Sequence, residues 1–124
     1  MAKKKMLQFS PERSELLEDR IRSYGYQAEK KKMFGHETFF TNGYMFAGAN
    51  VDGIFVHVGE EIRDNALDKA KDVALFSPME GMVMKEYLLL EEPVCSDEPQ
   101  LKAWLDTSYA YLNGLPLKTG KKKK

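Results

Sequence analysis

Residues 32–58 read KMFGHETFFTNGYMFAGANVDGIFVHV, and this stretch decides the fold. Short aromatic and β-branched runs alternate in it with two turn dipeptides, Asn42-Gly43 and Asp52-Gly53. Both dipeptides tolerate the positive φ angles that tight hairpins need. The stretch therefore predicts an antiparallel meander with strands near Glu37–Thr41, Tyr44–Asn50 and Ile54–Val58.

The residues before the meander predict a helix and an edge strand. Ser10 is a hydroxyl N-cap followed by Pro11, so a helix is expected over Pro11–Tyr24, with Arg13 and Arg20 on its solvent face. Residues 26–34 predict a first strand that carries Lys30, Lys31 and Lys32 outward. Lysines on an edge strand discourage aggregation, and a small anion-binding patch is the alternative interpretation.

The residues after the meander predict two more helices and one or two strands. Helical spacing favours a helix over residues 60–70, and residues 74–76 favour a short strand. A further strand is expected from Met82 to Leu90, and its end is apolar at every position, which indicates a central strand or a subunit contact. Pro93 stops it. Ser96 and the acidic residues after it are expected to open a last helix that ends before Gly114.

These elements define the fold class. The sequence predicts a two-layer α+β domain, with an antiparallel sheet of about four meander strands plus one or two later strands, packed with about three helices. A chain of 124 residues is expected to hold one domain. The expected boundaries are a basic tail at residues 1–10, the domain at 11–117 and a lysine-rich tail at 118–124.

Composition points to a cytoplasmic protein. No run approaches the roughly 20 apolar residues that span a bilayer. With one cysteine, Cys95, the chain forms no internal disulfide, which fits a reducing compartment.

Charge is segregated along the chain. The tails hold eight lysines, whereas the body holds 11 basic and 19 acidic residues, a net charge of −8. An acidic body matches a phosphate backbone poorly. The tails are interpreted as solvated ends, and nucleic-acid contact through them stays the alternative.

An ordered set of strings resembles the TfoX N-terminal domain family, related to the bacterial competence regulators TfoX and Sxy. The matching strings are Lys32-Met33-Phe34-Gly35, Tyr44-Met45-Phe46-Ala47-Gly48, Ile54-Phe55-Val56-His57-Val58-Gly59, Phe76-Ser77-Pro78-Met79-Glu80-Gly81-Met82-Val83-Met84-Lys85-Glu86-Tyr87 and Leu101-Lys102-Ala103-Trp104-Leu105. The resemblance runs from about Pro11 to the terminus. It implies a compact domain on an antiparallel sheet and brings no catalytic residues. Full-length competence regulators carry a second, helical domain, and we expect this chain to act without it.

No motif in the sequence predicts catalysis, a cofactor or a metal. His57 alternates with Val56 and Val58, so it lies on the sheet face of Phe55 and is interpreted as structural or solvated. Cys95 is interpreted as an ordinary thiol. The acidic pairs at residues 60–61 and 91–92 are interpreted as solvated caps. The glycines form neither a dinucleotide-binding motif nor a P-loop.

Apolar residues on both faces of the meander raise the question of what covers the second face. Water, more of the chain or another subunit are the three possibilities. The methionines, Met45 among them, suit either a core or an adaptable binding surface. The predicted interaction surface consists of Phe55, His57, Tyr87, Leu88, Leu89 and Leu90.

The sequence thus favours a non-enzymatic bacterial module that binds an unidentified protein partner and forms a homodimer. A link to competence or transcription regulation follows only from the resemblance. The alternatives are a nucleic-acid-binding accessory protein that uses its basic tails, and a small enzyme or ligand-binding domain with a pocket between sheet and helices.

Overall fold

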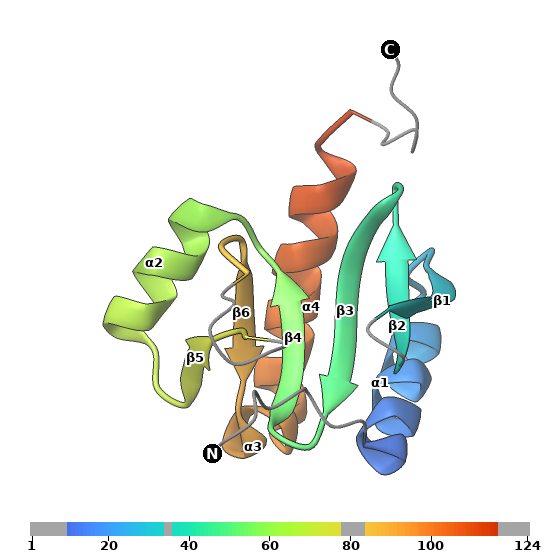
Figure 1. Cartoon of the computed structure of the whole chain (residues 1–124), viewed down its shortest axis with the longest axis horizontal. Helices are drawn as coiled ribbons and strands as arrows, with labels where there is room; N and C mark the ends of the chain where they lie inside the picture. Colours follow the sequence, from blue (N-terminus) through green and yellow to red (C-terminus); the bar gives the residue numbers. More distant parts are fainter. Residues whose placement is uncertain (1–9, 34–35, 78–83, 117–124) are drawn as a thin grey trace, which may run out of the picture.

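A computed structural model describes residues 10–33, 36–77 and 84–116. In these ranges four helices pack against one six-stranded antiparallel sheet (Figure 1). The strands are β1 (Glu29–Met33), β2 (His36–Thr41), β3 (Tyr44–Asn50), β4 (Gly53–His57), β5 (Val73–Leu75) and β6 (Tyr87–Leu90). The helices are α1 (Pro11–Tyr24), α2 (Glu60–Lys69), α3 (Glu92–Cys95) and α4 (Glu98–Asn113). No helix in the described ranges is long and apolar enough to cross a membrane.

The strand order is β1-β2-β3-β4-β6-β5, and every neighbouring pair is antiparallel. β1 to β4 form the predicted meander, and β5 and β6 are the two later strands, so the predicted α+β class is confirmed. β6 lies between β4 and β5, which confirms the central-strand interpretation of its apolar sequence.

β6 is shorter than predicted. It begins at Tyr87 and not at Met82, because Lys85 and Glu86 form a turn. The Glu86 carbonyl oxygen accepts hydrogen bonds from the backbone N–H groups of Val58 and Gly59, both at 2.9 Å. The turn thus joins the end of β4 to the start of α2. Residues 82 and 83 lie outside the described ranges.

The two hairpin turns differ from each other. Asn42 and Gly43 have φ of 54° and 84°, so the first turn uses the positive φ angles that its sequence predicts. In the second hairpin Gly53 pairs with Asn50, so the loop is Val51-Asp52 and not Asp52-Gly53. The Asn50 side-chain oxygen shapes this loop, because it accepts hydrogen bonds from the N–H groups of Asp52 (2.7 Å) and Gly53 (3.2 Å).

The first helix follows its prediction, whereas the first strand is shorter than expected. The Ser10 hydroxyl accepts a hydrogen bond from the Arg13 N–H, and Gly25 ends α1 with φ of 80°. β1 begins at Glu29 and not at Tyr26, because the Tyr26 ring packs into the core instead. Its centroid lies 5.5 Å from that of Phe46.

The main core lies between the sheet and the layer of α1, α3 and α4 (Figure 1). Its side chains include Leu17, Ile21, Phe46, Ile54, Val56, Leu88, Leu90, Leu101, Leu105 and Leu112. Each helix contributes one apolar stripe and the sheet one face, as two-layer packing requires.

The opposite face of the sheet carries a second, smaller cluster. Phe55 on β4 stacks on Phe76, with ring centroids 4.1 Å apart, and Met45 and Tyr87 join them. Phe55 can lie flat because its neighbour on β3 is Gly48, where a Cβ would approach the Phe55 ring to 2.4 Å. Water, more of the chain and another subunit were the three possible covers for this face. Phe76 belongs to the same chain, so the chain itself covers this cluster.

The short helix α3 was not predicted. Pro93 does not simply stop the chain after β6 but stands in the first turn of this helix. As a result, Ser96 ends α3, and Asp97 is the N-cap of α4, where its carboxylate accepts a hydrogen bond from the Gln100 N–H.

Candidate functional site

A groove of about 490 Å³ runs between α2 and α4. Five residues at α2 line one wall and two residues of α4 line the other: Ile62, Asn65, Ala66, Lys69, Ala70, Trp104 and Thr107. α2 packs against β5 and β6 at one end of the sheet, while α4 lies over β3 and β4 (Figure 1). The two helices are therefore held apart by the sheet beneath them.

Trp104 is the main apolar group of this groove. Its side chain is half-buried and packs against the core together with Ile62. The small side chains of Ala66 and Ala70 leave space beside it. A partly exposed tryptophan between helices offers a large apolar surface with one polar N–H, the kind of group that anchors binding interfaces.

The groove is poor in charge, and several of its hydrogen-bond donors have no partner among the described residues. Lys69 is its one charged lining residue, and within the described ranges it has no carboxylate within 4.0 Å. Likewise, no group in these ranges accepts a hydrogen bond from the Trp104 indole N–H or from the Asn65 amide. The groove can thus accept an apolar group that brings its own hydrogen-bond acceptors.

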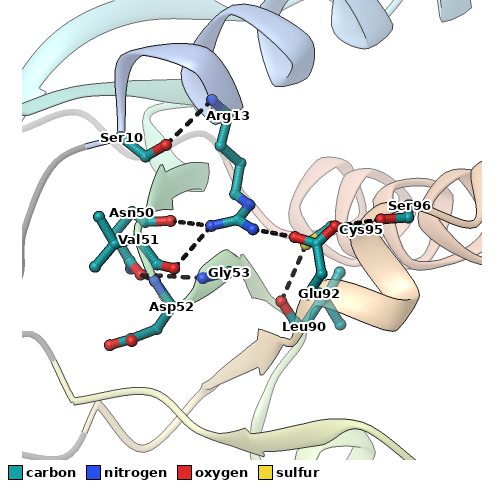
Figure 2. A network of polar contacts seen from close by, with 10 residues as sticks. All are labelled: Ser10, Arg13, Asn50, Val51, Asp52, Gly53, Leu90, Glu92, Cys95 and Ser96. Atoms are coloured by element: carbon teal, nitrogen blue, oxygen red, sulfur yellow. Dashed lines mark hydrogen bonds and ion pairs between the residues drawn. The ribbon is translucent and has the colours of Figure 1, made fainter.

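A polar network around Arg13 connects α1 to the loop between β3 and β4 and to α3 (Figure 2). The Arg13 guanidinium donates to the carbonyl oxygens of Asn50 (2.7 Å) and Val51 (2.9 Å) and pairs with Glu92. Arg13 was expected on the solvent face of its helix, but only 16% of its side chain is exposed, so that expectation is wrong. All these donors are engaged within the chain, which makes the network a structural clamp.

Glu92 and Cys95 belong to the same network. Hydrogen bonds from Ser96 and from Arg13 lower the pKa of the Glu92 carboxyl, whose side chain is 63% exposed in the first turn of α3. Cys95 lies in α3 and donates its S–H to the Leu90 carbonyl oxygen at 3.2 Å. Burial raises the pKa of the Cys95 thiol, so it behaves as the ordinary thiol that was expected.

His57 is a structural histidine. Its Nδ1 lies 3.0 Å from the Met45 carbonyl oxygen, its Nε2 lies 2.8 Å from Glu86 Oε1, and its ring stacks on Tyr87. Burial, and after it the negative charge of Glu86, raises the pKa of Tyr111. Both ring nitrogens of His57 are thus engaged within the chain.

The residues of the predicted interaction surface lie inside the folded chain. Phe55 is 1% exposed, and His57 and Tyr87 are each 8% exposed. Leu88 and Leu90 are fully buried under the helices, whereas Leu89 is half-buried on the opposite face. The six residues therefore divide between the two faces of the sheet.

The predicted anion patch lies on the edge strand β1, and most of its charge is matched. Lys30 is 3.2 Å from Glu18 and 3.8 Å from Glu37. Lys31 is 3.7 Å from Glu29 and its ammonium lies over the Phe40 ring. Lys32 stands opposite Glu37 in the register. These carboxylates compete with any external anion.

In the described ranges, no three His, Cys, Asp or Glu side chains are placed to share a metal ion. We take the α2–α4 groove as the candidate site because it is lined by the half-buried Trp104, and sequence reasoning missed it. Its one sequence signal is that Trp104 falls at the border of the apolar stripe of its helix.

Comparison with family models gives a match that covers most of the chain. The model of the TfoX N-terminal domain matches residues 21–112. This range contains the whole sheet and both walls of the groove, but not Arg13. No curated protein and no solved structure matches the chain.

Proposed function

Because the chain belongs to the TfoX N-terminal domain family, we propose that it is a cytoplasmic, non-catalytic module that binds a protein partner in the groove between α2 and α4. The observation that carries this proposal is the half-buried Trp104, which lines an open groove with a single charge. The buried thiol of Cys95 is compatible with a reducing compartment.

The polar clusters around Arg13 and His57 differ from the groove in that their polar atoms are already bonded within the chain. The donors of Arg13 and the ring nitrogens of His57 already have partners within the chain. The groove keeps apolar surface and donors that have no partner among the described residues, and its volume lies in the range of roughly 300–1,000 Å³ that is typical of ligand sites. A cleft between two helices suits a third helix laid into it, a common mode of peptide recognition.

The test is a displayed peptide library selected on the wild-type chain. Peptides that occupy the groove should lose at least about tenfold in affinity on Ala70→Tyr, because this substitution places a neutral ring in the groove. Asp68→Tyr adds the same ring at a neighbouring exposed position outside the groove and should bind normally. Trp104 is the single tryptophan of the chain, so its fluorescence reports occupancy directly.

Peptides that bind Ala70→Tyr as well as the wild type, and that leave the Trp104 emission unchanged, would show that the groove is not the docking surface. A random library makes this comparison possible whichever protein is the natural partner.

We also propose that the chain forms a homodimer through β5, which is an edge strand of the described sheet. The two edges of the sheet differ, because β1 carries three lysines whereas β5 reads Val73-Ala74-Leu75 and has no charge. Leu75 is 45% exposed, and Leu67 on the adjacent α2 is 37% exposed. Antiparallel pairing of two identical edge strands obeys the twofold symmetry of a dimer.

Light scattering coupled to size-exclusion chromatography at low micromolar concentration checks the dimer. Light scattering should give the wild type a molar mass of about twice the chain mass of 14.2 kDa. Leu75→Lys should be monomeric, because it places a charge at the edge. Val51→Lys changes a similarly exposed residue in the β3–β4 loop and should stay dimeric. A monomeric wild type would contradict the proposal.

A further inference from the structure

We infer that the segment bound in the α2–α4 groove is an amphipathic helix with an acidic side chain that pairs with Lys69. This inference rests on the proposed function, because it names the chemistry of the partner for that same groove. It makes Lys69 the residue that selects the ligand.

The charges around the groove support an acidic ligand. Lys69 is the one charged lining residue, and it lacks a carboxylate partner in the described ranges. The acidic residues of α2 do not supply one, since the helical period turns Asp64 and Asp68 away from the wall that Ala66 and Lys69 form. On α4, Asp106 is engaged elsewhere by Tyr26 and Lys102.

The neutral groups of the groove point the same way. The Trp104 indole N–H and the Asn65 amide lack acceptors among the described residues, whereas the Thr107 hydroxyl already donates to the Ala103 carbonyl oxygen at 2.9 Å. A ligand that brings carboxylate oxygens can satisfy these donors as well as Lys69.

The same charge disfavours the basic tails of this chain as occupants. A lysine-rich segment would place like charges next to Lys69, and neither tail holds an acidic side chain that could pair with it. The net negative charge of the body acts against any acidic ligand, but exposed charges farther away than about 8–10 Å are largely screened at physiological salt. The positive charge of Lys69 in the groove therefore determines the preference for an acidic ligand.

The test uses three synthetic helical peptides of about 15 residues, which is about four turns. They share a leucine stripe at helical spacing and differ only at the position beside this stripe, which holds glutamate, glutamine or lysine. Affinities are measured from Trp104 fluorescence on the full chain. The glutamate peptide should bind about three- to fivefold more tightly than the glutamine peptide, as a single partly exposed ion pair allows.

Substitutions on the protein complete the test. Lys69→Gln should abolish the glutamate preference, and Lys69→Glu should transfer it to the lysine peptide. Lys71→Gln removes a neighbouring exposed lysine outside the groove and should preserve the preference. Added salt should narrow the gap between the glutamate and glutamine peptides.

The possible failures are distinguishable. Equal binding of all three peptides that still responds to Ala70→Tyr overturns the inference and leaves the proposed function standing. Tightest binding of the lysine peptide also overturns it and would point to a basic occupant such as the tails. Absence of binding by any of the three overturns the acidic-helix inference, and the proposed function then stands or falls with the displayed library.

Discussion

Gly53→Ala should destabilise the domain more than an added methyl group at any of its other described glycines. A Cβ at Gly53 would lie 2.0 Å from the carbonyl oxygen of Leu90. That oxygen cannot retreat easily, because Leu90 belongs to β6 and is held by β4 on one side and β5 on the other. In addition, the φ of 156° at Gly53 is one that L side chains rarely adopt.

We expect Gly53→Ala to lower the free energy of unfolding by about 3 kcal/mol or more, in the upper range for overpacking. Urea unfolding followed by Trp104 fluorescence and far-ultraviolet circular dichroism measures this change.

Gly25→Ala is the matched control. Gly25 also has a positive φ, of 80°, but nothing lies within 4 Å of its Cβ position. Its substitution should cost about 1–2 kcal/mol, the strain of the left-handed conformation alone. Equal losses in the two variants would show that backbone strain, and not the contact with Leu90, makes Gly53 necessary.

Phe46→Ala should cause the second large loss, roughly 3–5 kcal/mol of unfolding free energy. Phe46 is fully buried on β3, and its ring makes edge contacts with Tyr26 (5.5 Å) and Tyr109 (5.7 Å). These tyrosines come from the segment after α1 and from α4. Removing the ring thus leaves a cavity where the sheet and two separate segments meet.

The same denaturant titration measures the Phe46 effect, and Phe46→Leu is its control. Leucine keeps an apolar group of intermediate size, so the loss should fall to about 1–2 kcal/mol. A loss below about 1 kcal/mol for Phe46→Ala would mean that the neighbouring tyrosines collapse into the space, contrary to rigid packing around this ring.

Local rules predicted the parts of the fold that depend on near neighbours in the chain. The Asn42-Gly43 turn, the Ser10 cap and the Gly25 end of α1 were all predicted correctly, because each is set within about four residues. The second hairpin was predicted one residue out of place. Its glycine serves a distant contact with Leu90, which the dipeptide Asp52-Gly53 does not reveal.

The same limit applies to charged side chains. Arg13 was placed in solvent because its position in the helix is polar by local spacing. In the structure its partners are Asn50, Val51 and Glu92, which stand 37, 38 and 79 positions away in sequence. Contacts across such separations depend on how the helices lie on the sheet, and helical periodicity holds no information about this.

The sequence by itself determined the fold class, the meander, the apolar central strand and the family resemblance, because periodicity, turn residues and ordered strings are local properties. Only the tertiary structure decided what covers each face of the sheet, where Arg13 finds its partners and that α2 and α4 stand apart. The candidate site depends on that last fact, since a groove between two helices exists only once the sheet has set the distance between them.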